Sequence, residues 1–430
     1  MLTDLNQAEL AAKERDLANR LATLKRVNLS LDLTRGKPSP EQLALSDQVE
    51  FMTGNDFKTE DGADARNYGG LSGIAEARQL GAQLLGVDAG NVIAGGNSSL
   101  TLMYQYLLHA WLNGTTGPET AWRHEGEQLK FLCIVPGYDR HFKITESLGF
   151  ELINIGFTAE GPDMDQIETL VDNDPLIKGI WCVPKYSNPT GHVYSDTVVE
   201  RMALLAKRAG MNFRIMWDNA YAVHDLTSDP PPLLNLMEQC QAVGTEDSAI
   251  LFASTSKVTR AGSGISFIAA STCNLVSFRR SLGVQTIGPD KVNQLRHVRF
   301  LKNLGGINEL MQRHAAIVRP KFDRVVKHLR DGLSANGVGM WTVPQGGYFI
   351  SFESPPGLAS AIVQLAGETG VKLTPAGATF PYGRHPNDSN IRLAPTFPTL
   401  AEIDQAMPVF VTAVTLAAVR QQLGMIIKVP

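Results

Sequence analysis

The sequence predicts an α/β fold, in which a large domain with a mostly parallel central sheet flanked by helices is joined to a smaller α/β domain. Three observations lead to this prediction. Apolar runs of strand length alternate with helical stretches between residues 91 and 254, a pattern typical of parallel sheets covered by helices. Polar or aromatic side chains follow the end of each of these strands. After about Lys302 the pattern changes to a long helical stretch followed by short strands.

The length of the chain predicts two domains, because 430 residues are more than one ordinary hydrophobic core can organise. We expect residues 51–305 to form the large domain. Residues 1–50 and 306–430 would together form the smaller one.

Composition and charge exclude several classes of protein. The 39 basic and 43 acidic residues nearly balance, without the basic block that nucleic-acid binding requires. The N-terminus lacks the apolar core of a signal peptide. The longest apolar stretch, Ala406–Val419, is about two-thirds of the ~20 residues that span a bilayer and contains Pro408, so it predicts a packing helix. We therefore expect a cytoplasmic protein without membrane or nucleic-acid partners.

The four cysteines are scattered and show no CxxC spacing. They are Cys133, Cys182, Cys240 and Cys273. We expect them to be buried, reduced side chains, and predict neither disulfides nor a metal site.

The first elements are a helix over residues 4–27 and the short strand Leu31–Leu33. The loop Thr34–Pro38 follows, in which Gly36 lies between two cations. Such a turn could hold an anion, and the alternative is a solvated loop. Next comes the glycine-rich loop Arg66–Gly73, which contains Tyr68 and leads into a helix over residues 74–85.

A second glycine-rich segment follows the strand Asn91–Ala94 and opens a helix that runs to about Leu108. Its residues Gly96, Asn97 and Ser98 would present free N–H groups at a helix start, which favours an anion such as phosphate. The segment matches neither a Walker loop nor the dinucleotide-binding fingerprint.

Four further strands are expected, over Lys130–Val135, Gly179–Val183, Phe213–Trp217 and Ala249–Ser254. In parallel sheets ligands bind beyond the carboxyl ends of the strands. The side chains that follow these ends, in chain order, are Tyr138, Asn188, Asp218, Tyr221 and Lys257. A sheet built only for stability would not need this chemistry.

The last third of the chain predicts a helix over residues 308–335, a strand over Gly346–Phe352 and a helix over residues 358–369. The strand Asn390–Leu393 carries Arg392 within an otherwise apolar stretch. A final helix is expected to begin at Thr399, because the spacing of Thr399 and Glu402 forms a capping box.

Lys257 is the first functional candidate. It lies at the end of an apolar strand, where burial would lower its pKa and favour a nucleophilic amine; the alternative is a surface lysine in a loop. A lysine of this kind could form an imine with an aldehyde cofactor. A pyridine-type cofactor also needs a carboxylate beside its ring nitrogen, and Asp218 could supply it.

Other side chains could complete such a site. Tyr221 and Asn188 could hydrogen-bond the phenolic oxygen of the ring, and Tyr138 could stack on its face. Ser254 and the helix start at Gly96–Ser98 could hold a phosphate. Arg392 could bind a substrate carboxylate through two parallel hydrogen bonds. Each residue also has a structural alternative, as a helix cap, a core aromatic side chain or half of an ion pair.

Taken together, these motifs resemble a known family. Asn188–Gly191, Asp218-x-x-Tyr221, Ser254-x-Ser256-Lys257 and Arg392 come in the order of class I aminotransferases of the fold-type I pyridoxal-phosphate enzymes. Gly95–Leu100, Pro136-x-Tyr138-x-x-His141 and Pro344-x-Gly346-Gly347-x-Phe349 match further landmarks of that family. The resemblance covers about residue 36 to the end, and is greatest to a divergent bacterial subgroup of aspartate aminotransferases.

The resemblance implies a role for each matching residue. Lys257 would form the imine with pyridoxal 5'-phosphate, and Asp218 would pair with the ring nitrogen. Asn188 and Tyr221 would contact the phenolic oxygen, and Arg392 would bind the α-carboxylate. The implied reaction moves the amino group of L-aspartate to 2-oxoglutarate by a ping-pong mechanism, so the partners are amino acid and 2-oxo acid substrates.

The resemblance also implies a homodimer with shared active sites, since Tyr68 is similar to the tyrosine that reaches the cofactor phosphate of the neighbouring subunit. The sequence departs from the family at Ile265, where most relatives have a phosphate-binding arginine. Arg260 could replace it or point to solvent. The arginine that binds the distal carboxylate in better-known aspartate enzymes has no clear counterpart, and the candidates are Arg35, Lys37 and Arg140.

Two other functions remain open at this level. The same motifs would serve an aminotransferase for aromatic or other amino acids, or a pyridoxal-phosphate β-lyase or decarboxylase, because these differ in the distal pocket. A ligand-sensing domain of a transcription regulator is a remote alternative, since only one helix precedes the part that carries the motifs.

Overall fold

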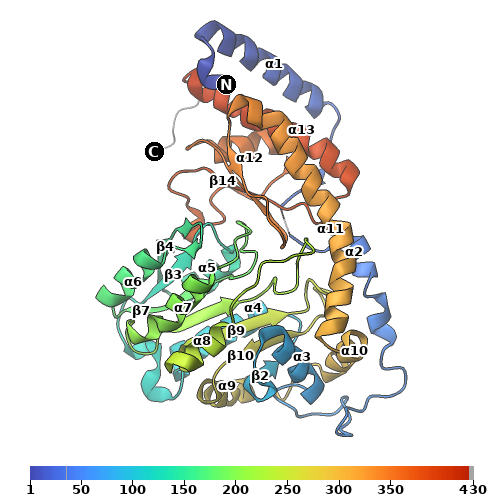
Figure 1. Cartoon of the computed structure of the whole chain (residues 1–430), viewed down its shortest axis with the longest axis vertical. Helices are drawn as coiled ribbons and strands as arrows, with labels where there is room; N and C mark the ends of the chain where they lie inside the picture. Colours follow the sequence, from blue (N-terminus) through green and yellow to red (C-terminus); the bar gives the residue numbers. More distant parts are fainter. Residues whose placement is uncertain (35, 426–430) are drawn as a thin grey trace.

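The computed structural model of the chain describes residues 1–34 and 36–425. A large sheet with its helices occupies the lower half of Figure 1, and α1 (Gln7–Lys25), α12 (Ala359–Glu368) and α13 (Leu400–Gln422) pack together in the upper half. The long helix α11 (Leu304–Leu333) runs between the two halves.

The large sheet has seven strands in the order β2-β10-β9-β8-β7-β3-β4. Their bounds are β2 (Val92–Ala94), β3 (Lys130–Ile134), β4 (Glu151–Ile155), β7 (Ile177–Cys182), β8 (Arg214–Asp218), β9 (Ala249–Ser254) and β10 (Ser266–Ala269). Every neighbouring pair is parallel except those of β10, which is antiparallel to both β2 and β9. The predicted α/β class with a mostly parallel sheet is therefore confirmed.

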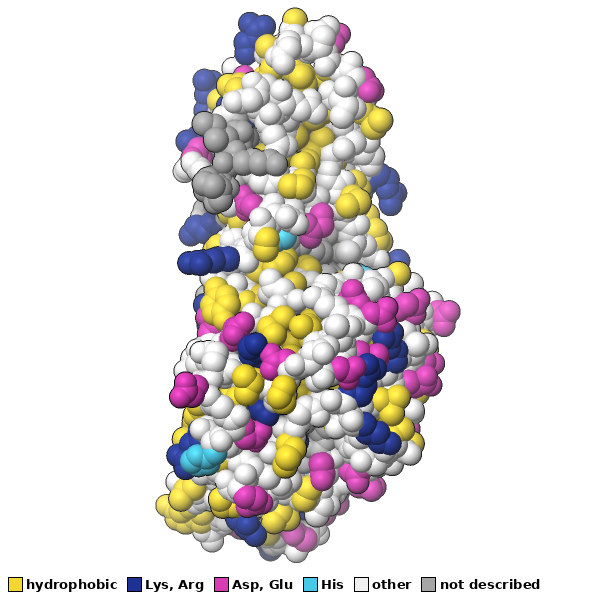
Figure 2. Space-filling model, turned by 90° about the vertical axis from the view of Figure 1, so that its left-hand side faces the viewer, with side chains coloured by type: hydrophobic (Ala, Val, Ile, Leu, Met, Phe, Trp, Pro, Cys, Tyr) yellow, Lys and Arg dark blue, Asp and Glu magenta, His cyan; other side chains and the backbone are white. Residues whose placement is uncertain are grey.

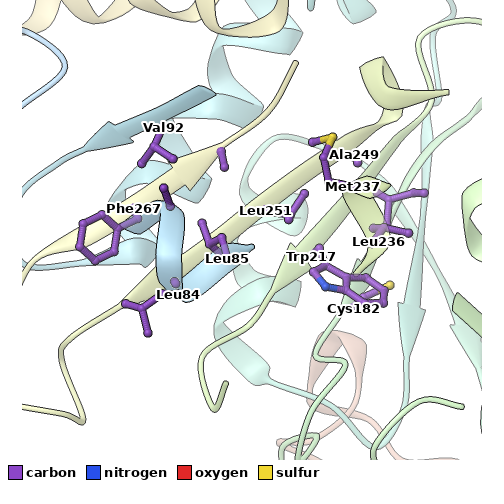
Figure 3. Close-up of a cluster of buried hydrophobic side chains, with 14 of the residues drawn as sticks. Leu84, Leu85, Val92, Cys182, Trp217, Leu236, Met237, Ala249, Leu251 and Phe267 are labelled. Carbon is purple, nitrogen blue, oxygen red and sulfur yellow. The ribbon is translucent and has the colours of Figure 1, made fainter. Parts of the chain in front are cut away.

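Both faces of this sheet are covered, because successive residues of a strand point to opposite sides. Leu251 of β9 belongs to one apolar cluster and Phe252 to another. Figure 3 shows the first of these clusters, in which Leu84 and Leu85 of α3 lie over the strands that carry Leu251 and Phe267. The flanking helices are α3 (Ala75–Leu85), α4 (Ser99–Asn113), α5 (Asp139–Ser147), α6 (Met164–Asn173), α7 (Asp196–Leu204), α8 (Leu236–Val243), α9 (Thr272–Gln285) and α10 (Lys291–Leu301).

The upper half has a core of its own, built from both ends of the chain. β11 (Met340–Trp341), β12 (Ile350–Glu353) and β14 (Asn390–Leu393) form an antiparallel sheet, and β1 (Leu31–Asp32) pairs with β13 (Val371–Lys372) in parallel. Apolar side chains of α1, α12 and α13 belong to the same buried cluster. The helix α11 contributes Met311 to the cluster under the large sheet and Val318 to this second cluster, so it links the two cores. The exact domain boundaries stay a prediction.

The remaining short elements are α2 (Pro40–Ala44), which follows the loop around Gly36, and the hairpin of β5 (Phe157–Thr158) with β6 (Gly161–Pro162). Acidic and basic side chains lie close together on the lower, wider part of the face in Figure 2. Charged side chains also join α6 and α7, where Arg201 contacts Asp165 at 2.5 Å and Glu168 at 2.7 Å.

The predicted strand over Gly346–Phe352 is wrong in its first half, since β12 begins only at Ile350. Gly346 and Gly347 instead run against the segment after β8. Gly347 N donates to His224 O at 2.9 Å, and Leu226 N donates to Gln345 O at 2.8 Å. This pairing joins the two halves of the molecule close to the end of β8.

Two further expectations need correction. Of the four cysteines, Cys273 is exposed, because it lies in the first turn of α9 with its Sγ 2.8 Å from Asp247 Oδ1. In addition, no strand was predicted at β4, and no helix was predicted at α8, α9 or α10. The apolar residues of β4 alternate irregularly with exposed and polar ones, so its sequence carries no clear strand pattern.

The helix α13 contains the apolar stretch expected to pack inside the protein. Among the described helices it alone is long and apolar enough to cross a membrane, but 72% of its most apolar 18-residue window is buried. Thr399 caps it by accepting a hydrogen bond from Glu402 N, as the capping box predicts.

We expect Gly346→Ala to lower the free energy of unfolding by about 1–3 kcal/mol, the usual cost of forcing atoms into a packed site. An added Cβ would lie 2.2 Å from Tyr186 Cε2 and 2.6 Å from His224 O. Urea denaturation followed by circular dichroism measures the change. Gly367→Ala in α12 is the matched control, because no heavy atom in the described part of the chain lies within 4 Å of its added Cβ. Equal stability of the two variants would contradict the prediction.

Candidate active site

The ends of the parallel strands open into a cavity of about 750 Å³ between the large sheet and the upper half. The sequence-predicted site residues that line it are Gly36, Ser98, Tyr138, Asn188, Asp218, Tyr221, Ser254, Lys257 and Arg392. They come from segments far apart in the chain. The cavity lies where ligands are expected to bind in an open parallel sheet.

Lys257 lies in the turn that follows β9. The turn is held by Thr255, whose Oγ1 accepts from Ile265 N at 2.9 Å. The ammonium nitrogen of Lys257 lies 4.9 Å from the centroid of the Tyr221 ring. Burial lowers the pKa of Lys257, and the negative charge of Asp218 partly opposes this effect. A lowered pKa increases the fraction of neutral, nucleophilic amine at physiological pH.

Asp218 is the last residue of β8 and is buried. Its Oδ2 lies 3.0 Å from Nε2 of His141, whose ring stacks on Trp181 with 4.2 Å between centroids. Its Oδ1 is buried and has no hydrogen-bond partner among the described residues. Since an unpaired buried oxygen is costly, this atom is suited to bind the protonated nitrogen of a ligand.

Two tyrosines line the cavity near Asp218. Burial raises the pKa of Tyr221 well above its ordinary value and raises the pKa of Tyr138 to about 12. Both phenols therefore keep their protons near neutral pH and can donate hydrogen bonds. Tyr138 also packs edge-on against His141, with 4.9 Å between ring centroids.

Arg392 reaches the cavity from β14. Its Nη1 donates to Asn188 Oδ1 at 3.3 Å, and its Nη2 donates to Thr34 O at 3.4 Å. Asp139 Oδ1 lies 3.5 Å from Nη1, and the guanidinium lies over the ring of Phe349. These contacts are long, and Nε has no partner in the described part of the chain. The guanidinium thus retains donors for a carboxylate.

The start of α4 faces the same cavity. Ser98 caps the helix by accepting from Thr101 N at 3.4 Å, and Ser98 and Ser99 both line the cavity. Free N–H groups and the helix dipole make this end suitable for a phosphate.

Gly96 and Asn97 do not line the cavity. Gly96 O accepts from Ser266 N at 2.7 Å, and Asn97 Nδ2 donates to Gly262 O at 3.2 Å. Asn97 O accepts from Ser256 Oγ at 3.0 Å. These two residues therefore fasten the helix start to β10 and to the lysine turn.

Two other predicted cofactor-binding residues lie outside the cavity of this chain. The guanidinium of Arg260 is held by Glu50 Oε2 at 3.2 Å and by Asp47 O at 3.1 Å. The side chain of Tyr68 is 84% exposed. The structure does not bring either of them to Lys257.

The candidates for a distal carboxylate have different surroundings. Arg35 lies outside the described residues. Lys37 and Arg140 both line the cavity and are exposed. The ammonium of Lys37 lies 3.8 Å from the centroid of the Phe397 ring, and Arg140 Nε lies 3.9 Å from Asp139 Oδ2.

Sequence reasoning missed several residues of the site. His141 served only as a landmark of the resemblance, but it binds Asp218 directly. Asp139, Phe349 and Thr374 line the cavity and were not predicted to do so. Asp139 could have been found from its position directly after Tyr138. Thr374 carried no signal, because only the fold brings its turn to this edge of the sheet.

Comparisons with known proteins agree with this architecture. Residues 5–425 match a family model described as aspartate amino-transferase. The aspartate aminotransferase of Corynebacterium glutamicum is 44% identical over 418 residues, which cover 97% of this chain and 96% of that protein. A crystal structure of an aspartate transaminase from that species has a TM-score of 0.93 at 42% identity, covering 98% of this chain and 99% of that one.

A more distant structure shares the fold. The α-aminoadipate aminotransferase LysN of Thermus thermophilus, solved with N-(5'-phosphopyridoxyl)-L-leucine, has a TM-score of 0.74 at 20% identity, covering 94% of this chain and 97% of that one. Since the family model and the Corynebacterium protein both match nearly the whole chain, the protein belongs to the aspartate aminotransferase family of fold-type I pyridoxal-phosphate-dependent aminotransferases.

Proposed function

We propose that this aminotransferase moves the amino group of L-aspartate to 2-oxoglutarate, giving oxaloacetate and L-glutamate by a ping-pong mechanism with pyridoxal 5'-phosphate. The observation that carries the proposal is that Asp218, with its unpaired Oδ1, lines the same cavity as Lys257 and Arg392. The choice of aspartate is supported by the 44% identity to the Corynebacterium glutamicum aspartate aminotransferase.

The residues of the cavity fit this cofactor. Asp218 Oδ1 can accept a hydrogen bond from the protonated ring nitrogen, and Tyr221 and Asn188 can donate to the phenolic oxygen. The start of α4 at Ser98 and the hydroxyl of Ser254 can hold the phosphate. When bound, pyridoxal phosphate supplies an electron sink for the negative charge that develops at the substrate's α carbon.

The side chains of the chain then have distinct tasks. Lys257 would hold the cofactor through its amine, and the same amine could move the proton at the substrate's α carbon, which the lowered pKa of the lysine would assist. Arg392 binds the α-carboxylate and so fixes the orientation of the substrate. Phe349 lies under the guanidinium and shields it from water.

The proposal includes a homodimer. Tyr68 is 84% exposed in the single chain, which leaves it accessible to a neighbouring subunit, and the family resemblance assigns it to that subunit's phosphate. Arg260 could bind phosphate only after leaving Glu50. We therefore assign the phosphate mainly to Ser98 and Ser254.

The cofactor assignment predicts that the purified protein is yellow and that Lys257→Ala loses both this absorbance and turnover. Turnover should fall by roughly 10²- to 10⁴-fold, because the group that transfers the proton is removed. Absorbance spectra and a coupled aminotransferase assay measure the two effects. Lys207→Ala, on an exposed lysine, is the control and should behave like the unmodified protein. Normal turnover by Lys257→Ala would refute the assignment.

The substrate assignment predicts a preference among amino donors. With 2-oxoglutarate as acceptor, kcat/KM for aspartate should exceed that for alanine and phenylalanine by at least roughly tenfold, since a site that pairs a second carboxylate rejects donors without one. A panel of amino donors, assayed by glutamate formation, decides this point. If alanine or phenylalanine equals aspartate, the protein is an aminotransferase for another substrate. Release of ammonia or carbon dioxide without glutamate would indicate a lyase or decarboxylase.

We expect Arg140 to bind the distal carboxylate. Asp139 is shared by both guanidiniums, with its Oδ1 3.5 Å from Arg392 Nη1 and its Oδ2 3.9 Å from Arg140 Nε, so the two arginines could bind the two ends of a dicarboxylate. The ammonium of Lys37 already makes a cation–π contact with the ring of Phe397.

Arg140→Gln should therefore lower kcat/KM for aspartate by roughly ten- to a hundredfold, the usual cost of a lost charge-assisted hydrogen bond. The value for alanine should change less than about twofold. Lys37→Gln is the matched comparison, assayed with the same two donors. If Lys37→Gln changes the aspartate-to-alanine ratio and Arg140→Gln does not, the assignment passes to Lys37.

A further inference from the structure

A chain of buried hydrogen bonds runs from α2 to the backbone of the lysine turn. Gln42, His314 and Tyr348 are all at most 2% exposed. Gln42 Nε2 lies 3.1 Å from Tyr348 Oη and 3.0 Å from His314 Nδ1. Tyr348 Oη in turn donates to Lys257 O at 3.4 Å. None of these three side chains lines the cavity.

The direction of each hydrogen bond in this chain follows from the cap of α2. Ser39 N donates to Gln42 Oε1 at 3.0 Å, which fixes the amide oxygen of Gln42 toward the helix start. Both amide hydrogens of Gln42 are then directed to Tyr348 and His314. Because Tyr348 Oη accepts one of them, its own hydrogen remains to donate to the carbonyl of Lys257.

His314 fits this arrangement only as an acceptor at Nδ1, which requires a neutral ring. Burial lowers the pKa of His314 to about 4, so the ring is neutral at physiological pH. The directions of the three bonds are therefore mutually consistent. Nε2 of His314, which carries the hydrogen in this tautomer, is buried without a partner among the described residues.

The same side chains connect the lysine turn to distant parts of the fold. Tyr348 packs against His224 with 5.5 Å between ring centroids, and against Tyr221, which lies under the Lys257 ammonium, with 6.0 Å. His314 lies on α11, the helix that links the two cores. Gln42 lies in the first turn of α2, the helix that follows the cavity-lining loop at Gly36.

We propose that Gln42 and Tyr348 are positioning residues that hold the backbone of Lys257 and thereby set where its amine stands in the cavity. They act on Lys257 through its carbonyl and touch neither substrate nor cofactor. The inference rests on the proposed role of Lys257. The competing explanation is a buried polar cluster that contributes only to stability.

The test uses the cofactor-loaded enzyme and the variant Tyr348→Phe, which removes only the hydroxyl. In the cofactor-loaded enzyme the nitrogen of Lys257 would be bonded to the cofactor, and the visible absorbance would report the protonation of that nitrogen. A looser turn would let this nitrogen reach water, so the desolvation that disfavours its protonated form would weaken. The pH midpoint of the cofactor's visible absorbance should therefore rise by about 0.3–1 unit, the range that one ordinary hydrogen bond can supply. We expect kcat to fall by about three- to tenfold, with KM changed less than about twofold.

The titratable groups that face Lys257 are Asp218, Tyr221, Tyr138, His224 and Tyr348 itself. Burial raises the pKa of Tyr348, so the hydroxyl that Tyr348→Phe removes carries no charge. The other four groups are retained, so a shifted midpoint reports the position of the lysine. Gln42→Met keeps nearly the same shape but removes the amide that makes the hydrogen bonds. It should shift the midpoint in the same direction by a smaller amount. The double variant should resemble Tyr348→Phe alone, because both changes break one chain of bonds.

Tyr106→Phe is the matched control. Tyr106 is also fully buried, and its hydroxyl donates to Asn274 Oδ1 at 2.8 Å, away from the cavity. This variant should lower the melting temperature without moving the absorbance midpoint. If Tyr348→Phe and Gln42→Met likewise lower only the melting temperature, the cluster is structural and the proposal is wrong. A failure of the Lys257 assignment would show separately, in Lys257→Ala.

Discussion

The parallel pairing of β7, β8 and β9 is the constraint on which the site depends. Trp217 is paired with Cys182 on one side and with Leu251 on the other, and Asp218 is paired with Phe252. This register ends β8 two residues before the end of β9. Asn219 N then donates to Phe252 O at 2.9 Å and extends the pairing past Asp218. A slip of one residue would turn Asp218 to the other face of the sheet, away from the cavity.

The buried charges of the site are balanced by neutral groups as well as by each other. Asp218 has one oxygen on His141 and the other unpaired among the described residues, and the Lys257 ammonium lies 4.9 Å from the centroid of the Tyr221 ring. A fully paired site would be more stable and less useful, because each group would have to lose a partner before binding a ligand. The cost of the unpaired atoms is offset by the apolar clusters on both faces of the sheet.

The sequence was sufficient wherever one local signal decided the structure. β9 has the predicted bounds because its run of apolar residues is continuous, and the start of α13 follows from the side chains of Thr399 and Glu402. The sequence was insufficient where a segment far away in the chain determines the local structure. Gly346 and Gly347 look like the start of a strand, but Tyr186 and the backbone of His224 occupy the space beside them. Arg260 was a candidate phosphate ligand because it follows Lys257 closely in the sequence, and only the fold shows that its Nη1 lies 3.2 Å from Glu50 Oε2.

The position of Arg392 shows how the two halves of the molecule share the site. Its strand, β14, belongs to the upper half, whereas Asn188 and Asp139, which it contacts, follow strands of the large sheet. Its third contact, Thr34, lies next to β1, which pairs with β13. All three contacts are between 3.3 and 3.5 Å, weaker than a close ion pair. If Arg392 binds a substrate carboxylate as proposed, the carboxylate would compete with these contacts, so substrate binding and the packing of the two halves would be energetically coupled at this one side chain.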